Sequence, residues 1–235
     1  MACNPRRPEW PTPRLRLGTW LLLTGLLLTG LSSGRVDWDF ARILQNAEQS
    51  HGTLGPAQGR IEAWSQMLQG ERNAPEREQL NTVNRFFNQQ LSFQDDTRIW
   101  HQTDYWATPI ESLIKGAADC EDYALAKYFS LRQLGIPSEK LRITYVKALN
   151  QNQAHMVLTF YGSPNADPLV LDNLIGDIRF ASQRKDLLPV YAFNAEGLYL
   201  SGTHGDTRSS DSKKLSRWQD VLHKMQAEGF AVGNG

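Results

Sequence analysis

The sequence lacks an excess of charge of either sign, since its 235 residues include 25 basic and 25 acidic side chains. Nucleic-acid-binding domains are normally rich in clustered Lys and Arg, so we exclude this class of partner. Internal repeats and low-complexity tracts are also missing. The hydrophobic content of 40% is ordinary for a globular protein, and the length suffices for one domain behind a small N-terminal extension.

A hydrophobic run long enough to cross a membrane is missing too. The apolar run at residues 17–31 is short, and it follows four arginines and precedes Ser32, Ser33 and Gly34. A basic head, a short apolar core and small residues at the end are typical of an export signal. We therefore expect residues 1–34 to be a signal peptide cleaved after Gly34. The alternative is an uncleaved membrane anchor, which the shortness of the run disfavours.

Cysteine is scarce, because the chain contains only Cys3 and Cys120, and cleavage of the signal would remove Cys3. Cys120 would then be a free thiol in an oxidising compartment, without a disulfide partner. Such a thiol is either buried and inert or a nucleophile, and the count alone leaves both open. Asp119, Glu121 and Asp122 surround it, and nearby negative charge raises the pKa of a thiol.

Helical patterns fill the first half of the chain. The apolar spacing predicts helices over residues 38–49, 59–70 and 75–93. Gly70 is the expected C-cap of the second helix, and residues 93–107 are expected to be a loop. Trp100 and Trp106 in this loop belong either to the core, which we favour, or to a substrate cleft.

Two further helices precede the predicted sheet. Thr108 is the expected N-cap of a short helix that begins with Pro109, and Glu111 completes a capping box. The next helix has apolar residues at helical spacing and Asp119 as its expected N-cap. Cys120 therefore lies in the first turn of a helix of about four turns.

Strand patterns follow in the second half. Residues 141–149 are rich in β-branched and aromatic residues and predict a strand. Residues 155–161 and 169–174 follow as two more strands, each after a turn segment, which favours a β-meander. Residues 188–194 and 197–202 are candidates for two more strands, and residues 203–212 for a flexible linker. An amphipathic helix over residues 212–229 ends the predicted domain. The predicted class is α+β, with helices packed on an antiparallel sheet.

Cys120, His155 and Asp172 form an ordered set of chemically active residues. A thiol nucleophile needs a base within hydrogen-bond reach, and the base needs an acceptor that orients it. His155 and Asp172 lie on strands that a short turn joins, so they should be antiparallel neighbours. The helix N-terminus lowers the pKa of the thiol, and its backbone N–H groups can serve an oxyanion hole.

The segments "DCEDYALAKYFSLRQLGIP", "AHMVL" and "LVLDNL" resemble the bacterial transglutaminase-like cysteine proteases, from about residue 38 to about residue 199. This resemblance implies a papain/transglutaminase-like fold over residues 35–235. Its helical part would span residues 36–115, its catalytic core 116–200 and its C-terminal linker and helix 201–235. It further implies Cys120 as nucleophile, His155 as general base and Asp172 as orienting acid.

The resemblance also implies a calcium site, because members of this family depend on Ca²⁺ bound around the nucleophile. The corresponding residues here are Asp119, Glu121 and Asp122. Calcium prefers several oxygen ligands, and its charge would cancel the local negative charge that opposes a thiolate. The alternative from the residues alone is that these acids only favour the helix N-terminus.

As partners, the resemblance implies a large repeat-containing surface adhesin, cut in its N-terminal region at an Ala-Ala-Gly-type site. An inner-membrane receptor for cyclic di-GMP would sequester the protease in the periplasm and so control biofilm dispersal. Two alternatives stay open. The same triad can transfer an acyl group to an amine, as in a transglutaminase or amidase, or the chain is a non-catalytic, calcium-responsive binding module.

Overall fold

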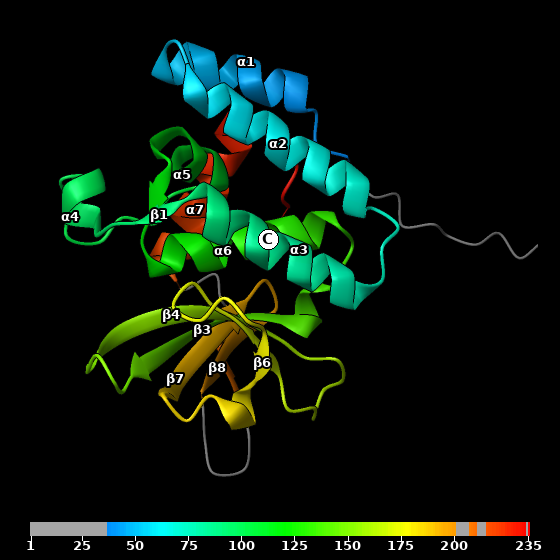
Figure 1. Cartoon of the computed structure of the whole chain (residues 1–235), viewed down its shortest axis with the longest axis vertical. Helices are drawn as coiled ribbons and strands as arrows, with labels where there is room; N and C mark the ends of the chain where they lie inside the picture. The colour runs from blue at the N-terminus through cyan, green and yellow to red at the C-terminus, as the bar shows by residue number, and fades with distance from the viewer. Residues whose placement is uncertain (1–36, 201–206, 211–214, 234) are drawn as a thin grey trace, which may run out of the picture. The chain divides into compact units, whose positions relative to one another are not determined.

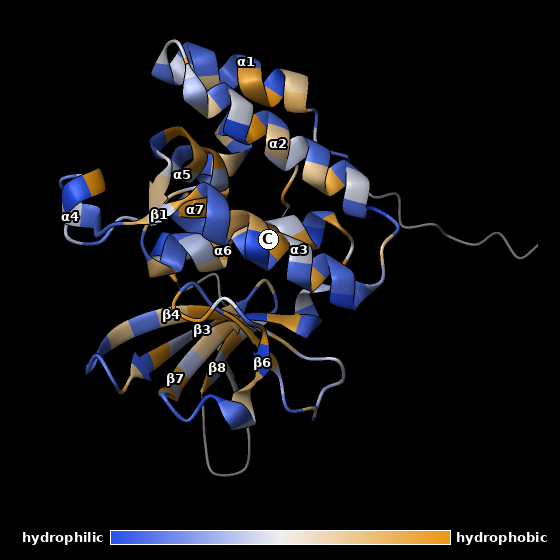
Figure 2. Ribbon diagram, viewed as in Figure 1, coloured by the Kyte–Doolittle hydropathy of each residue, from blue (hydrophilic) through white to orange (hydrophobic). Residues whose placement is uncertain are grey.

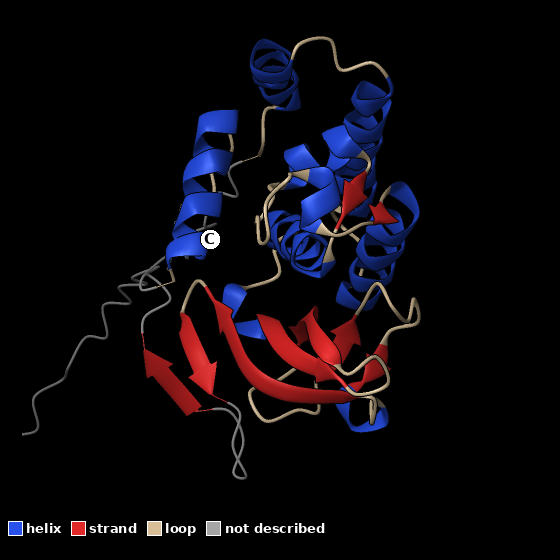
Figure 3. Cartoon of the chain, turned by 90° about the vertical axis from the view of Figure 1, so that its left-hand side faces the viewer, coloured by secondary structure: helices blue, strands red, loops and turns tan. Residues whose placement is uncertain are grey.

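Helices and strands separate into two layers, which Figures 1 and 3 show from two directions. This computed structural model describes residues 37–200, 207–210, 215–233 and 235, so the predicted signal peptide lies outside the described residues. The described residues belong to one unit, Arg35–Gly235. Within the described ranges, no helix is long and apolar enough to cross a membrane.

The helical layer consists of seven α-helices in the described ranges. They are α1 (Phe40–His51), α2 (Pro56–Glu71), α3 (Glu76–Gln90), α4 (Asp96–Ile99), α5 (Pro109–Lys115), α6 (Cys120–Gln133) and α7 (Ser216–Glu228). In Figure 2 hydrophobic residues recur between hydrophilic ones along α1, α2 and α3, as expected for helices with one buried side. The predicted helices are therefore present, with shifted ends.

Three local expectations were wrong. Helix α2 continues through Gly70 to Glu71 and has Arg72 as its C-cap, so Gly70 does not end it. The expected loop at 93–107 contains α4. The helix expected over 75–93 ends at Gln90, and Ser92–Phe93 instead form β1, which pairs in parallel with β2 (Ala117–Ala118). These pieces are too short to leave a periodic pattern in the sequence.

Helix α6 is the centre of the helical layer. Every residue from Asp122 to Leu131 is buried, so the helix has no solvent-facing side. It packs on strand β4 of the sheet and on helix α3 of the helical layer. Helix α7 also joins this core, because the Trp218 ring stacks on the Phe129 ring of α6 at a centroid distance of 5.4 Å. The predicted amphipathic C-terminal helix is thus confirmed over Ser216–Glu228.

The second layer is a seven-stranded antiparallel sheet in the order β6-β5-β4-β3-β7-β8-β9. Its strands are β3 (Leu141–Ala148), β4 (Gln153–Phe160), β5 (Leu169–Leu171), β6 (Arg179–Phe180), β7 (Leu187–Asn194), β8 (Gly197–Leu200) and β9 (Thr207–Ser210). The predicted three-stranded meander is confirmed in β3, β4 and β5, and β6, which was not predicted, continues it. Strand β7 pairs with the other edge of β3, and part of the predicted linker at 203–212 forms β9.

The chain crosses the sheet between β6 and β7 on the face that the helices do not cover. Val157 packs there with Val146 and Val170, while its neighbour Leu158 belongs to the main core. Successive residues of a strand point to opposite faces, so these valines mark the outer face. Ala181, in the 3₁₀ turn η2 (Ala181–Gln183), packs on the valines. The crossing segment continues with Arg184.

Candidate active site

Cys120 is the first residue of α6, and the residues before it fix this helix start. Helix α5 ends at Gly116, which adopts a left-handed conformation (φ 64°) and turns the chain into β2. The pairing of β2 with β1 then holds the segment that leads to Cys120. Asp119 occupies the predicted N-cap position, but its side chain makes no capping hydrogen bond. Its carboxylate is therefore available for another contact.

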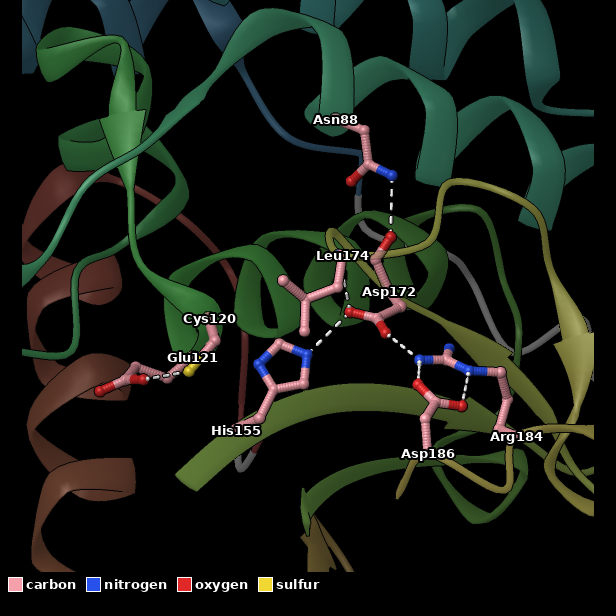
Figure 4. A network of polar contacts seen from close by, with 8 residues as sticks. All are labelled: Asn88, Cys120, Glu121, His155, Asp172, Leu174, Arg184 and Asp186. Carbon is pink, nitrogen blue, oxygen red and sulfur yellow. Dashed lines mark hydrogen bonds and ion pairs between the residues drawn. The ribbon is translucent and has the colours of Figure 1, made fainter. Parts of the chain in front are cut away.

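His155 and Asp172 lie at the same end of two paired strands. Strands β4 and β5 are antiparallel, with Leu158 opposite Leu171, and Asp172 directly follows β5. The Nε2 atom of His155 lies 2.8 Å from Oδ1 of Asp172, and both side chains are buried. The predicted antiparallel neighbourhood is confirmed (Figure 4).

Asp172 is held as a carboxylate. Burial alone would raise its pKa, but hydrogen bonds from His155, the Leu174 amide and Arg184 outweigh burial and lower the pKa to about 2. An ionised carboxylate can only accept hydrogen bonds, so Nε2 of His155 is the donor. The neutral imidazole then keeps a lone pair on Nδ1, on the ring side that faces Cys120 in Figure 4. This tautomer is suited to accept a proton from the thiol.

The Cys120 thiol itself donates a hydrogen bond to Glu121, with Sγ 3.0 Å from Oε2 (Figure 4). Burial raises the pKa of this thiol strongly, and the charges of Glu121 and Asp119 raise it further. In this state the thiol is protonated at neutral pH. The acidic surroundings therefore oppose the thiolate, as their sequence position predicted.

A cleft of about 410 Å³ exposes Cys120 and His155 on its wall. Two stacked aromatic pairs contribute to the wall: Trp106 with Phe193, at 5.5 Å, and Tyr145 with Tyr191, at 5.1 Å between ring centroids. Trp106 is thus a cleft residue and not simply a core residue. Trp100 is not part of this wall and packs on Tyr105.

Five carboxylates gather beside the nucleophile in two overlapping groups. The groups are Asp96, Asp119, Asp122 and Asp96, Asp104, Glu121, and in each group the oxygens lie within 4.8 Å of one another. Within the described residues, Asp96, Asp119 and Asp122 each keep one buried oxygen without a hydrogen-bond partner. Oxygens gathered in this way are the ligands that a hard divalent cation takes.

The cluster is electrostatically strained without a cation. Burial and the charges of its neighbours raise the pKa of Asp119 to about 10. Burial also raises the pKa of Asp96 to about 6, and the pKa of Asp122 is raised well above its usual value. Like charges in a dry site cannot all stay ionised unless a positive charge joins them.

Asp96 and Asp104 were missed by the sequence analysis, because they lie in the segment predicted to be a loop. The segment is bound to the cluster through its backbone: Asp122 accepts a hydrogen bond from Ala107 N at 2.7 Å, and Asp96 accepts one from Tyr105 N. The only feature of the sequence that could have indicated these ligands is the presence of three acidic residues in the segment, Asp95, Asp96 and Asp104. Their contact with α6 depends on tertiary structure that no local pattern encodes.

Arg184 was also missed. It is buried beside the triad, and its Nη2 donates a hydrogen bond to Oδ2 of Asp172 at 2.7 Å. The same guanidinium binds Asp186 with two hydrogen bonds (Figure 4). Asn88 of α3 donates to the backbone oxygen of Asp172 at 2.8 Å. The loop after β5 is therefore held from both layers of the fold.

The sequence matches the family described as bacterial transglutaminase-like cysteine proteinase over residues 61–186. A search of curated proteins found no match. A solved structure of LapG from Legionella pneumophila is 42% identical, with a TM-score of 0.67, covering 78% of this chain and 97% of that one. EGTA-treated L. pneumophila LapG gives 42% identity, a TM-score of 0.69 and the same coverage. Calcium-bound L. pneumophila LapG is 41% identical, with a TM-score of 0.68, and the match covers 81% of this chain and 99% of that one.

Proposed function

Because this chain belongs to the bacterial transglutaminase-like cysteine proteinases, we propose that Cys120, His155 and Asp172 are the catalytic triad of a calcium-dependent endopeptidase. The observation that carries the proposal is the buried 2.8 Å bond between His155 and Asp172 at the wall of the cleft that exposes Cys120. A thiol, a base and an orienting carboxylate in this order are the parts of a cysteine protease.

The proposed reaction begins with transfer of the Cys120 proton to Nδ1 of His155. The thiolate attacks the scissile carbonyl carbon, and the tetrahedral oxyanion is stabilised by backbone N–H groups at the start of α6. The C–N bond then breaks, and the leaving amine takes the proton from His155, which leaves a thioester on Cys120. His155 next takes a proton from water, whose oxygen attacks the thioester. A carboxylic acid product leaves, and the thiol is restored.

Asp172 has two roles in this scheme. Its carboxylate fixes the Nε2–H tautomer, so that Nδ1 and not Nε2 carries the lone pair toward the thiol. It also stabilises the imidazolium that forms when the thiol loses its proton. Both roles need an ionised carboxylate, which agrees with the pKa of about 2 at Asp172.

The acid cluster fits a calcium ion. Asp119, Glu121 and Asp122 are the residues that the sequence predicted as ligands, and Asp96 and Asp104 complete the groups. Three buried carboxylate oxygens lack a hydrogen-bond partner among the described residues, which is how ligands without their cation would look. Bound calcium would supply the positive charge that the cluster lacks. One of the similar LapG structures is described as calcium-bound.

For the substrate and the cellular role, we carry over what the family resemblance implies. The protease would act in the periplasm on the N-terminal region of a large repeat-containing adhesin, within an Ala-Ala-Gly-type sequence. A LapD-type inner-membrane receptor for cyclic di-GMP would sequester it, so that release of the adhesin follows a fall in this messenger.

The test is a cleavage assay with the purified protein, its Cys120→Ala variant and the N-terminal fragment of a candidate adhesin from the same cell. We expect a cut by the wild type in calcium and none with EGTA or with the variant. A cut that survives chelation would remove the calcium part of the proposal. Incorporation of a labelled amine without a cut would favour acyl transfer, and no reaction with a range of adhesin fragments would contradict the protease assignment.

Adding the periplasmic domain of the receptor tests the regulatory part separately. We expect it to suppress the cut made by the wild type. An unchanged cut in the presence of an excess of that domain would contradict this partner while leaving the protease assignment intact.

A further inference from the structure

We propose that Arg184 and Asp186 are positioning residues of the protease, which fix the carboxylate of Asp172 so that it can orient His155. This inference rests on the proposed triad. It concerns a part of the site that the sequence analysis did not identify, on the segment that crosses the outer face of the sheet between η2 and β7.

The two carboxylate oxygens of Asp172 accept hydrogen bonds from different partners. Oδ1 accepts from His155 Nε2 at 2.8 Å and from Leu174 N at 3.0 Å. Oδ2 accepts a hydrogen bond from Nη2 of Arg184 at 2.7 Å. Contacts at both oxygens fix the rotation of the carboxylate plane, and with it the direction in which Oδ1 faces the imidazole.

Arg184 also compensates the negative charge of Asp172. Asp172 is only 1% exposed, and a buried carboxylate is costly unless a cation and hydrogen bonds compensate it. The charge on the His155 imidazole changes as it takes up and gives back a proton during the proposed reaction. Arg184 is 3% exposed and permanently charged, so it supplies the missing charge throughout the reaction.

Lys127 of α6 is a second buried basic residue that interacts with Asp172. Burial lowers the pKa of Lys127, and the charge of Asp172 raises it. Its ammonium has no hydrogen-bond partner among the described residues, so it cannot fix the plane of the carboxylate. Arg184 can, because it holds Asp172 directly.

Asp186 completes the arrangement by holding Arg184. Its Oδ1 accepts a hydrogen bond from Nε of Arg184 at 2.9 Å and its Oδ2 accepts one from Nη2 at 2.7 Å, which is the two-bond fork of an Arg–carboxylate pair. The hydrogen bonds from Arg184 lower the pKa of Asp186. The fork fixes the guanidinium plane and so directs Nη2 at Oδ2 of Asp172. Asp186 thus positions Arg184, which positions Asp172, and Asp172 in turn orients His155.

The experiment compares Arg184→Gln, Arg184→Lys and Asp186→Asn in the full chain, with Arg179→Gln as matched control. Arg179 is an exposed arginine a few residues earlier, paired with exposed Asp177 at 3.6 Å. Two readouts are used: kcat and KM for cleavage of a substrate fragment in calcium, and the proton NMR signal of the His155 Nε2–H. The NMR samples carry Cys120→Ala in addition, so that they need no activity.

We expect Arg184→Gln to lower kcat about 10- to 100-fold while KM changes less than about twofold, since Arg184 does not line the cleft. The downfield Nε2–H signal should weaken or move upfield. Arg184→Lys should lie between this variant and the wild type, because an ammonium restores the charge without the fork. Arg179→Gln should match the wild type in both readouts.

An Arg184→Gln protein that is folded by circular dichroism and keeps both kcat and the Nε2–H signal would overturn the proposal. If this variant does not fold, Asp186→Asn decides, because Asp186 is partly exposed and tolerates the change better. It should lower kcat about tenfold and shift the signal, and unchanged values would overturn the proposal. If the wild type cleaves nothing, the proposed function fails on its own, and the NMR signal still decides the role of Arg184.

Discussion

The Cys120 thiol and the Glu121 carboxylate are joined by a hydrogen bond, with Sγ 3.0 Å from Oε2. Glu121 is also one of the acids whose oxygens gather with Asp96 and Asp104 within 4.8 Å. A single side chain therefore connects the proposed nucleophile to the acid cluster. A cation that takes up the charge of Glu121 would also change the environment of the thiol.

Neutralising Glu121 should make the thiol more reactive when calcium is absent. The charge of Glu121 is, after burial, the largest cause of the raised pKa of Cys120, so Glu121→Gln lowers that pKa. We expect alkylation of Cys120 by iodoacetamide in EGTA at pH 7 to become about tenfold faster. The control is Glu62→Gln, an exposed acid on α2, which should leave the rate unchanged. Equal rates in all three proteins would contradict the role given to Glu121.

Calcium binding should release protons and strengthen as the pH rises. In the metal-free chain the pKa of Asp119 is about 10, so this carboxyl group holds a proton at neutral pH, and calcium ligands must be deprotonated. Titration calorimetry at pH 7 in buffers of different ionisation enthalpy measures the released protons directly. An affinity that is the same at pH 6 and pH 8, with no proton release, would show that calcium binds elsewhere.

Asp96 should prove to be a calcium ligand although the sequence analysis did not select it. It belongs to both acid groups, and one of its oxygens is buried without a partner among the described residues. Asp96→Asn should therefore lower calcium affinity about tenfold or more. Its neighbour Asp95 is exposed and serves as the matched control, because Asp95→Asn removes the same charge from the same segment. Calorimetry that gives both variants the same affinity would exclude Asp96 as a ligand.

Lys127 should reduce stability at neutral pH. Burial lowers its pKa from 10.5 to about 7, so between these values the unfolded chain binds a proton that the folded chain does not. The free energy of unfolding therefore rises with pH across this window through Lys127, and the penalty is fully present below about pH 7. We expect Lys127→Met to be more stable at pH 7 by about 1 kcal/mol.

The measurement for this prediction is urea unfolding of the wild type and Lys127→Met at several pH values between 7 and 10, with chelator present. The stability difference between the two proteins should shrink as the pH rises toward 10.5, because the unfolded wild type then also loses the proton of Lys127 that the folded chain already lacks. Curves that stay parallel over this range would contradict the assigned titration of Lys127.

Local chemistry made much of this fold predictable. The capping box at Thr108 and Glu111, the apolar spacing around Tyr128 and the stripe at Trp218 each encode an element through its own residues. The neighbourhood of His155 and Asp172 was also predictable, since a short turn forces two strands to pair. What these residues do in catalysis stays a prediction until it is tested.

The parts that the sequence analysis missed depend on long-range contacts. Strand β7 pairs with β3 and not with β6, because the chain first crosses the valine cluster on the outer face of the sheet. No periodic pattern in the sequence predicts this crossing. Asp96 and Arg184 resemble ordinary loop residues until the fold carries them to the nucleophile and to Asp172. The N-cap residue Asp119 shows a different limit, since its position was predicted correctly but its side chain belongs to the acid cluster.

Activation of Cys120 by His155 and by the acid cluster is tested by the rate at which iodoacetamide alkylates Cys120 at pH 7, in calcium and in EGTA, for the wild type and His155→Ala. Peptide mapping by mass spectrometry assigns the alkylated residue and requires no substrate. We expect fast alkylation only for the wild type in calcium, and a rate at least about tenfold lower in each of the other three samples. Equal rates in all four samples would contradict a thiol that His155 activates and the acid cluster controls.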